Sequence, residues 1–219
     1  METKTKETTR IEAFSDGVFA IAITLLVLEL IATLHPQEGK GLLQSSWEHW
    51  ESFLAFIIGF ITILVCWINH HYAFEPIKKV DNSIMWINGS LLFLVTLTPF
   101  PTAILAEYLE KESHTALAIY GANYVLISVA AYSICRYAYT HQLIDHENRE
   151  SYHSFSLIYR YAILYTMVAF CLCFVSILLP ILMYIALFIA FAVPKKFAVA
   201  LGRMKQRRKN TKKQATGSK

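Results

Sequence analysis

Long runs of apolar residues, separated by short polar segments, dominate the chain from residue 11 onward. A helix that crosses the hydrocarbon core of a bilayer needs about 20 residues, because each residue advances the helix by about 1.5 Å. Runs of this length predict spans at about 11–33, 51–73, 84–106, 116–138 and 158–179. They are too long and too uniformly apolar for barrel strands, so the pattern predicts an all-α membrane protein.

The end of the apolar region allows a sixth span. No charged residue occurs between Tyr161 and Val193. One straight helix over this stretch would be about 50 Å long, against a hydrocarbon core of about 30 Å. Pro180 lies within the stretch, and proline kinks or breaks a helix. The stretch is therefore either one long kinked helix or two spans, with the second at about 181–200, joined by a tight turn.

The positions of the basic residues favour the second alternative. If the chain has six spans and a cytoplasmic amino terminus, 18 of its 20 Lys and Arg residues fall in cytoplasmic segments, and only Lys40 and Lys111 lie outside. Five spans would place the basic residues from Lys195 onward outside. Cytoplasmic loops carry an excess of Lys and Arg. We therefore predict one domain of six transmembrane helices over residues 1–200, a basic cytoplasmic tail over 201–219, and both termini in the cytoplasm.

Composition agrees with a membrane protein. The chain is 55% hydrophobic and 16% charged, against about 25% charged residues in soluble domains. Its net charge of +4 follows from the bias described above, and we expect the tail to lie near anionic lipid and not to bind nucleic acid. Metal and cofactor binding are not predicted, because the cysteines lie in or at the ends of apolar runs without zinc-site spacing. They are Cys66, Cys135, Cys171 and Cys173.

The first span carries one stripe of residues at heptad spacing. The stripe consists of Arg10, Phe14, Gly17, Ile21, Thr24 and Leu28, with Leu25 beside it. If several copies surround an axis, Ile21, Leu25 and Leu28 would form apolar rings, and Thr24 would add hydroxyl groups between them. Ordinary helix–helix packing explains the same spacing, and the pattern alone favours that explanation.

Polar residues recur near the predicted cytoplasmic ends of the first three spans. They are Ser15, Asp16, Trp67, His70, His71 and Asn88. A carboxylate in a membrane helix needs a partner inside the protein, and these donors and acceptors predict a hydrogen-bond network. Adjacent histidines on a helix point about 100° apart, so we expect one to face the network and the other to face solvent. A proton-sensing role for one of them stays open.

The third span contains two prolines in the stretch TPFPT. Pro99 and Pro101 predict a kink, or an end to the regular hydrogen bonding, late in this span. A simple bend and a functional hinge are equally compatible with the sequence.

Three stretches together resemble one family. Arg10, Phe14, Ser15 and Asp16 form the pattern R-x-x-x-F-S-D, which is followed by GVFAIAITLLVLEL. The second span ends in W-x-x-H-H, and the third runs from NGSLL to PFPT. This combination resembles the transmembrane protein 175 family of potassium channels in its prokaryotic, single-repeat form. The motifs cover the first half of the chain, whereas the second half is similar only in the number and length of its spans and in its basic tail.

The resemblance implies a potassium-selective channel in the cell membrane of a prokaryote. It implies a homotetramer in which the first span of each subunit lines the pore and in which the T-V-G-Y-G filter is absent. By position, the constriction falls on Ile21, Leu25 and Leu28, and the threonine linked to selectivity is Thr24. The residues expected in the network that holds the pore helix are Arg10, Phe14, Ser15, Asp16, Trp67, His70, His71 and Asn88. Of the two histidines, the family motif matches His71 by position, and His70 is included because it is adjacent.

Two other classes of protein are alternatives to a passive potassium channel. An ion-coupled secondary transporter often has matching interrupted spans in its two halves, and we find no such pair. An enzyme is not expected, because H-E-x-x-H and G-x-S-x-G motifs are absent from the sequence. Members of the resembling family also pass protons, so a proton-conducting channel stays an alternative beside the transporter.

Overall fold

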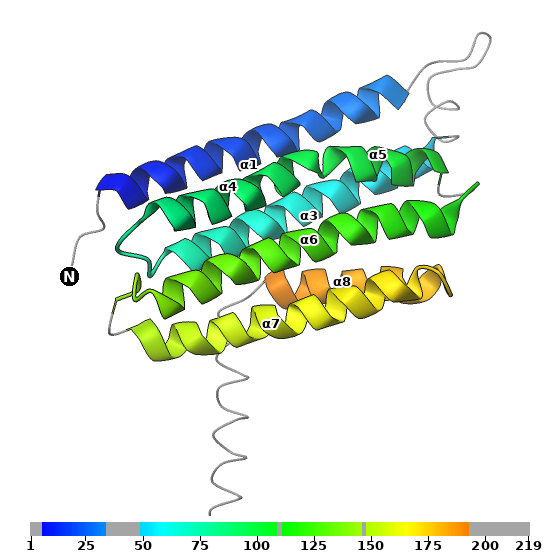
Figure 1. Ribbon diagram of the computed structural model, residues 1–219. Helices are drawn as coiled ribbons and strands as arrows, with labels where there is room; N and C mark the ends of the chain where they lie inside the picture. Colours follow the sequence, from blue (N-terminus) through cyan, green and yellow to red (C-terminus); the bar gives the residue numbers. More distant parts are fainter. Residues whose placement is uncertain (1–5, 34–48, 109–110, 146–147, 193–219) are drawn as a thin grey trace, which may run out of the picture.

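The computed structural model of the protein describes residues 6–33, 49–108, 111–145 and 148–192. Helices account for the regular structure within these ranges, apart from one isolated β-bridge between Ile77 and Ile144. The helices lie side by side as a bundle with their axes along one common direction (Figure 1). They are α1 (Lys6–Thr33), α3 (Trp50–Phe74), α4 (Asn82–Leu97), α5 (Pro99–Tyr108), α6 (Ser113–Thr140), α7 (Arg149–Leu172) and α8 (Leu178–Ala192).

The predicted all-α membrane architecture is confirmed. Five stretches are long and apolar enough to cross a bilayer, namely α1, α3, α4 together with α5, α6 and α7. Helix α8 is a shorter apolar helix of 15 residues. The remainder of the predicted sixth span beyond Ala192 lies outside the described residues, as does the tail over 201–219.

The turn between the last two helices lies earlier than the sequence predicted. The predicted span 158–179 begins inside α7, which extends from Arg149 to Leu172, but it continues past the end of that helix into the turn and the first residues of α8. The turn occupies residues 173–177, so the stretch forms two helices and not one kinked helix. Pro180 lies in the first turn of α8, where the missing N–H has no intrahelical partner to lose.

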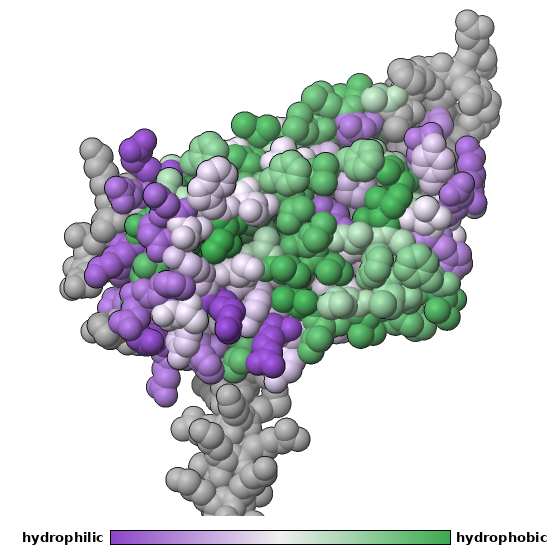
Figure 2. All heavy atoms as spheres, viewed as in Figure 1, coloured by the Kyte–Doolittle hydropathy of each residue, from purple (hydrophilic) through white to green (hydrophobic). Residues whose placement is uncertain are grey.

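Polar and apolar residues are separated along the bundle. Figure 2 shows a broad apolar band across the visible face and a concentration of hydrophilic residues at the end where α1 begins. The loop between α3 and α4 and the loop between α6 and α7 lie at this same end (Figure 1). The described basic residues on these segments are Arg10, Lys78, Lys79, Arg136 and Arg149. Lys111, in the loop between α5 and α6, lies at the opposite end.

Helix α1 lies at the edge of the bundle, against α3, α4 and α5 (Figure 1). Gly59 of α3 allows a close approach at this junction. A Cβ atom at Gly59 would lie 3.0 Å from Leu26 Cδ2 of α1 and 3.0 Å from Thr102 Cγ2 of α5. A larger residue at position 59 would push α1 away, so this glycine fixes how deeply the edge helix is seated.

The predicted interruption of the third span is present. Helix α4 ends at Leu97 and α5 begins at Pro99. Side chains satisfy polar groups at the break, because Asn123 Nδ2 of α6 donates to Thr98 Oγ1 over 3.2 Å and Thr102 Oγ1 donates to the Thr98 carbonyl over 2.8 Å. The break is therefore braced by hydrogen bonds to its neighbours.

The end of α6 contains a left-handed residue that is not glycine. Gln142 has a φ of 56°, and the Leu143 N–H donates to the Ala138 carbonyl over 3.1 Å, which closes the helix in a Schellman arrangement. We expect Gln142→Gly to raise the free energy of unfolding by about 0.5 kcal/mol, because glycine relieves left-handed strain but loses more entropy on folding. Gln142→Ala keeps the strain and should give no gain. Denaturant titration of the three proteins measures the difference, and equal stability of the Gly and Ala variants would contradict the expectation.

Asp81 connects the start of α4 to the end of α6. Its Oδ1 accepts the Ile84 N–H over 2.9 Å, and its Oδ2 accepts the Tyr137 hydroxyl over 2.9 Å. The bond from the Ile84 backbone, with that from Tyr137, holds the pKa of the Asp81 carboxyl below its ordinary value. The charged form is favoured in the folded protein, so its stabilising effect is present above the ordinary aspartate range and is lost as the pH falls through the lowered pKa.

We therefore expect Asp81→Asn to be less stable than the wild type by about 0.3–1 kcal/mol at pH 7, because a carboxylate at a helix amino terminus is favourable. The difference should disappear as the pH is lowered below about 4. Thermal unfolding of both proteins over this pH range measures it. A difference that stayed constant with pH would contradict the assignment to the Asp81 charge.

Candidate functional site

Helix α1 exposes the stripe of residues that the sequence singled out. Phe14, Ile21 and Leu28 are 67%, 60% and 58% exposed in the single chain, and Leu25 is 37% exposed. Thr24 is exposed between them, and its hydroxyl donates to the Ile21 carbonyl over 2.8 Å. The stripe thus points away from the described neighbours of α1 and presents large apolar side chains with one hydroxyl among them.

The opposite face of α1 is buried in the bundle. Ser15, Phe19, Ala22 and Leu26 are almost completely shielded. They recur at intervals of three or four residues, which is the spacing of one helix face. The exposed stripe and the buried face therefore belong to the same helix but have different surroundings, and α1 is an anchored helix with one free side.

A buried chain of hydrogen bonds connects α1, α4 and α3. Asn88 Nδ2 of α4 donates to Ser15 Oγ of α1 over 3.0 Å, and Asn88 Oδ1 contacts His70 Nε2 of α3 at 2.8 Å. Since Asn88 Oδ1 can only accept, His70 Nε2 carries the proton. The Ser15 hydroxyl in turn donates to the Ile11 carbonyl over 2.8 Å. All three linked side chains are buried, so the chain holds three helices in register.

The His70 ring is also fixed by aromatic contacts. It stacks on Phe74 with ring centroids 4.4 Å apart and an interplanar angle of 24°, and it lies 5.3 Å from the ring of Phe19. The ring therefore bridges a residue of its own helix and a residue of α1. Both contacts fix the orientation in which Nε2 meets Asn88.

A second, exposed pair connects α1 to α3. Trp67 Nε1 donates to Asp16 Oδ1 over 2.8 Å. Both side chains are exposed in the single chain, as are His71 and Arg10. The His71 ring centroid lies 6.5 Å from that of Trp67. Within the described residues, Arg10 forms no ion pair with Asp16.

The structure thus divides the residues that were grouped by sequence into two sets. Ser15, His70 and Asn88 form the buried chain, while Asp16 and Trp67 form an exposed pair with His71 beside it. The adjacent histidines have different surroundings, with His70 buried and His71 exposed. Arg10 and Phe14 lie on the exposed side at the same end of α1 and join neither set within the described residues.

Sequence reasoning missed one buried polar contact next to this network. Asn69 Nδ2 donates to the Val65 carbonyl over 2.7 Å and to the Phe191 carbonyl over 3.0 Å. Its Oδ1 accepts the Tyr159 hydroxyl over 3.0 Å. Asn69 therefore ties α3 to α7 and α8. An amide in an apolar helix signals that a partner exists, but it does not reveal on which helix.

The buried polar residues in the described part of the chain are uncharged apart from the titratable His70. Apolar helices, buried side-chain hydrogen bonds between them and an edge helix with one free side define an α-helical, multi-pass membrane protein. The buried face of α1 is held by its neighbours, and the exposed stripe on its other side has no neighbour among the described residues.

Comparison with known proteins identifies the family within this class of membrane proteins. Residues 10–99 match the family model described as "Endosomal/lysosomal potassium channel TMEM175". A protein of Chamaesiphon minutus named as a potassium channel is 41% identical over 191 residues, which cover 85% of this chain and 94% of the relative. The chain belongs to the TMEM175 family.

The resemblance extends beyond the motifs of the first half. A crystal structure of a lysosomal potassium-selective channel TMEM175 homolog from Chamaesiphon minutus is similar with a TM-score of 0.78 and 40% identity, over 87% of this chain and 99% of that one. A Gallus gallus protein named as the endosomal/lysosomal proton channel TMEM175 is 30% identical over 154 residues, which cover 67% of this chain and 30% of that protein. The family assignment inferred from the motifs is confirmed.

Proposed function

We propose that this protein is a potassium-selective channel that conducts ions passively along a central pathway lined by α1 of four subunits. The exposed stripe on α1 is the observation that carries this proposal. A helix anchored on one face, with large apolar side chains exposed on the other, is suited to line an axis shared by several copies. The potassium channels among the relatives support the choice of ion.

In the proposed pore, rings of Ile21, Leu25 and Leu28 form the constriction. Rings of aliphatic side chains exclude water unless the helices move apart, and an ion that loses its water faces a high barrier. Thr24 lies between these rings in sequence. The Thr24 hydroxyl donates its proton to the Ile21 carbonyl. The lone pairs of its oxygen therefore stay available to a cation. Four such oxygens replace part of the hydration shell of a potassium ion, without a T-V-G-Y-G filter.

The buried chain from Ser15 through Asn88 to His70 holds α1 in place, and Asp16 with Trp67 provides a second attachment. The end carrying Arg10, Lys78 and Arg149 faces the cytoplasm of a prokaryote, in agreement with the positive-inside bias. Both termini then lie on the cytoplasmic side of the cell membrane. Arg10, exposed near the mouth of the pathway, is available to a neighbouring subunit.

A proton-conducting channel is the second candidate function, because the Gallus gallus relative is named as a proton channel. An ion-coupled transporter is the third. A passive potassium channel requires no coupling ion, whereas a transporter saturates and depends on its counter-ion. The two channel candidates differ in the ion that they conduct, which is potassium in the first and the proton in the second.

Reconstituted vesicles distinguish the three candidates. The purified protein is placed in vesicles loaded with potassium salt, in a sodium medium, with valinomycin-treated vesicles as the full-flux reference and a trapped dye that reports pH. We expect potassium efflux well above that of empty vesicles, without added coupling ions. Efflux that needs a counter-ion would indicate a transporter, and a pH change without potassium efflux would indicate a proton channel. Cross-linking of the same sample should give a tetramer.

A further inference from the structure

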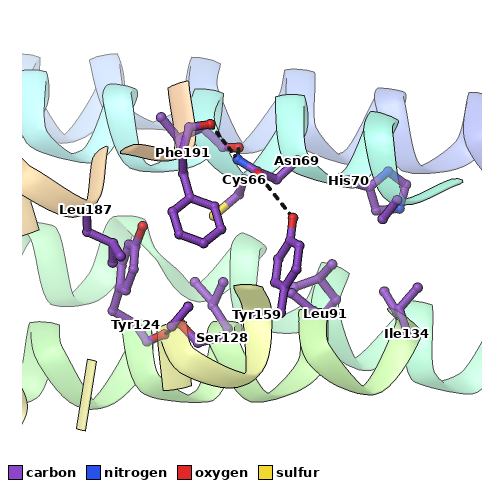
Figure 3. A pocket seen from close by; sticks show the side chains of 15 residues that line it. Cys66, Asn69, His70, Leu91, Tyr124, Ser128, Ile134, Tyr159, Leu187 and Phe191 are labelled. Carbon is purple, nitrogen blue, oxygen red and sulfur yellow. Dashed lines mark hydrogen bonds between the residues drawn. The ribbon is translucent and has the colours of Figure 1, made fainter. Parts of the chain in front are cut away.

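A cavity of about 50 Å³ lies inside the subunit, away from the exposed stripe of α1. Residues of α3, α4, α6, α7 and α8 line it, and α1 contributes none. Figure 3 shows Cys66, Asn69 and His70 on α3 facing Tyr124 and Tyr159 on the helices opposite. The cavity is therefore a feature of the single subunit and not of the proposed pore.

The lining of the cavity restricts the charge of an occupant. It is mostly apolar and contains no Lys, Arg, Asp or Glu. A charged molecule would lose its hydration without gaining a counter-charge, so the cavity suits an uncharged one. Asn69 is already occupied by its bonds to Val65, Phe191 and Tyr159.

Tyr124 supplies a hydrogen-bonding group for an occupant. Its side chain is 6% exposed, and no residue in the described ranges forms a hydrogen bond with its hydroxyl. Figure 3 shows the side chain rising from α6 toward α3 at the cavity. The hydroxyl oxygen is not among the fully shielded atoms that lack a partner, so it is open to the cavity and can donate to or accept from a molecule there. An occupant with one hydroxyl of its own satisfies it, while its apolar part contacts Ile127, Leu187 and Phe191.

The volume of the cavity limits the size of an occupant. A water molecule occupies about 10–15 Å³ on this scale, so the cavity holds roughly three or four atoms the size of a water oxygen. An engineered cavity that binds benzene is about 150 Å³, which is larger than this one. The occupant is thus a molecule of about four non-hydrogen atoms.

We propose that this cavity is a binding site for a small uncharged amphiphile of the short-chain alcohol class, and that its occupant acts on α1. His70 provides the connection, because its ring lines the cavity and its Nε2 is bound to Asn88, which is bound to Ser15 of α1. A molecule that contacts the His70 ring is two hydrogen bonds away from the proposed pore helix.

Cys66 is a native reporter, since it is a free cysteine that lines the cavity. The full-length protein in detergent is treated with methyl methanethiosulfonate, which transfers a methylthio group to the thiol and releases methanesulfinate. Mass spectrometry follows the labelling rate of Cys66. We expect n-propanol to slow this labelling in a saturable manner. A labelling rate that is independent of n-propanol would mean that the cavity holds water alone, and would overturn the proposal.

Two tyrosine variants localise the effect. Tyr124→Phe removes the hydroxyl in the cavity, and about five-fold more n-propanol should be needed for the same protection. Tyr184→Phe removes a buried hydroxyl that has no partner among the described residues and does not line the cavity. It should behave as the wild type. Equal protection in the wild type and Tyr124→Phe would place the bound n-propanol elsewhere and would contradict the site.

If Cys66 does not react, a diffraction measurement tests whether the cavity binds a small alcohol. Crystals of the full-length protein are soaked in 2-bromoethanol, which has four non-hydrogen atoms, and the bromine is located by anomalous scattering. We expect a peak in the cavity near Tyr124. Bromine peaks at the outer surface of the bundle alone would overturn the proposal.

The effect on α1 rests on the proposed function, whereas binding does not. In the vesicle assay, n-propanol should change the potassium efflux of the wild type, and about five-fold more should be needed for the same change in Tyr124→Phe. If vesicles show no efflux but Cys66 is protected, the site stands and the channel fails. If efflux is normal but no protection and no bromine peak are found, the channel stands and the site fails.

Discussion

Replacing Ile21 with alanine is expected to raise the potassium flux by about ten-fold or more. Ile21 is 60% exposed on the free side of α1 and forms the first aliphatic ring of the proposed constriction. In the proposed tetramer, shortening this side chain in every subunit widens the ring and weakens its exclusion of water. A ten-fold increase corresponds to a barrier lowered by about 1.4 kcal/mol. The vesicle efflux assay measures the change, normalised to the amount of tetramer.

Val27 provides the matched control for this prediction. It is an aliphatic residue of the same helix and is 41% exposed, but it points about 120° away from Ile21 around the helix axis. Val27→Ala should leave the flux within about two-fold of the wild type, because it lies off the stripe. Equal increases in both variants would indicate general loosening of α1, and an unchanged flux in Ile21→Ala would remove Ile21 from the constriction.

Replacing Asn88 with leucine is expected to lower the free energy of unfolding by about 1–3 kcal/mol. The change leaves the His70 Nε2 proton without its acceptor and removes a donor from Ser15, and a buried polar group without a partner costs this amount. Because the chain positions α1, the potassium flux should fall as well. Denaturant titration in detergent, followed by tryptophan fluorescence, measures the stability.

Ser90 is the control for this second prediction. It lies on the same helix and is exposed, with its hydroxyl bonded to the Trp86 carbonyl of α4 itself. Ser90→Ala should change the stability by less than about 0.5 kcal/mol. The double variant His70→Phe with Asn88→Leu should recover part of the loss, since both polar partners are then replaced by apolar groups. A double variant less stable than Asn88→Leu alone would contradict this account of the chain.

The spans that are uniformly apolar could be predicted well from the sequence. Predicted ranges 51–73 and 116–138 lie inside α3 and α6, because apolarity and helix length coincide there. The start of α7 could not be placed in this way. Its first turns, from Arg149, are polar, so the helix begins before the apolar run. Hydropathy measures whether a residue favours water or lipid, and it does not report whether the backbone is helical.

Pro180 shows a second limit of sequence reasoning. A proline in an apolar run signals that regular helical hydrogen bonding is interrupted nearby, but it is compatible with a turn before it or after it. The chain turns at residues 173–177, and Pro180 lies in the first turn of α8. By contrast, Pro99 coincides with the break between α4 and α5, because it is the first residue of α5.

Some contacts of the candidate site could be predicted from the sequence, but the full set of partners could not. Ser15 and Asn88 were expected to meet, and they form a hydrogen bond. Which of two adjacent histidines enters the network depends on the rotation of α3 about its axis, and that rotation is set by packing over the whole helix. The contact of Asn69 with Tyr159 was missed for the same reason, since it needs the position of α7.

The measurement that most directly tests the central claim is silver block of a cysteine variant on the stripe. Leu28 is exposed on the stripe, and its neighbour Val27 points about 100° away. Silver ions are close in size and charge to potassium ions and bind thiolates. Both variants are made in a parent whose four native cysteines are replaced by alanine, because silver also binds those thiols. If α1 lines the potassium pathway, a low concentration of silver should stop potassium efflux through Leu28→Cys while sparing Val27→Cys and the cysteine-free parent. Efflux through Leu28→Cys that persists in silver, with the tetramer intact, would contradict a pathway lined by α1.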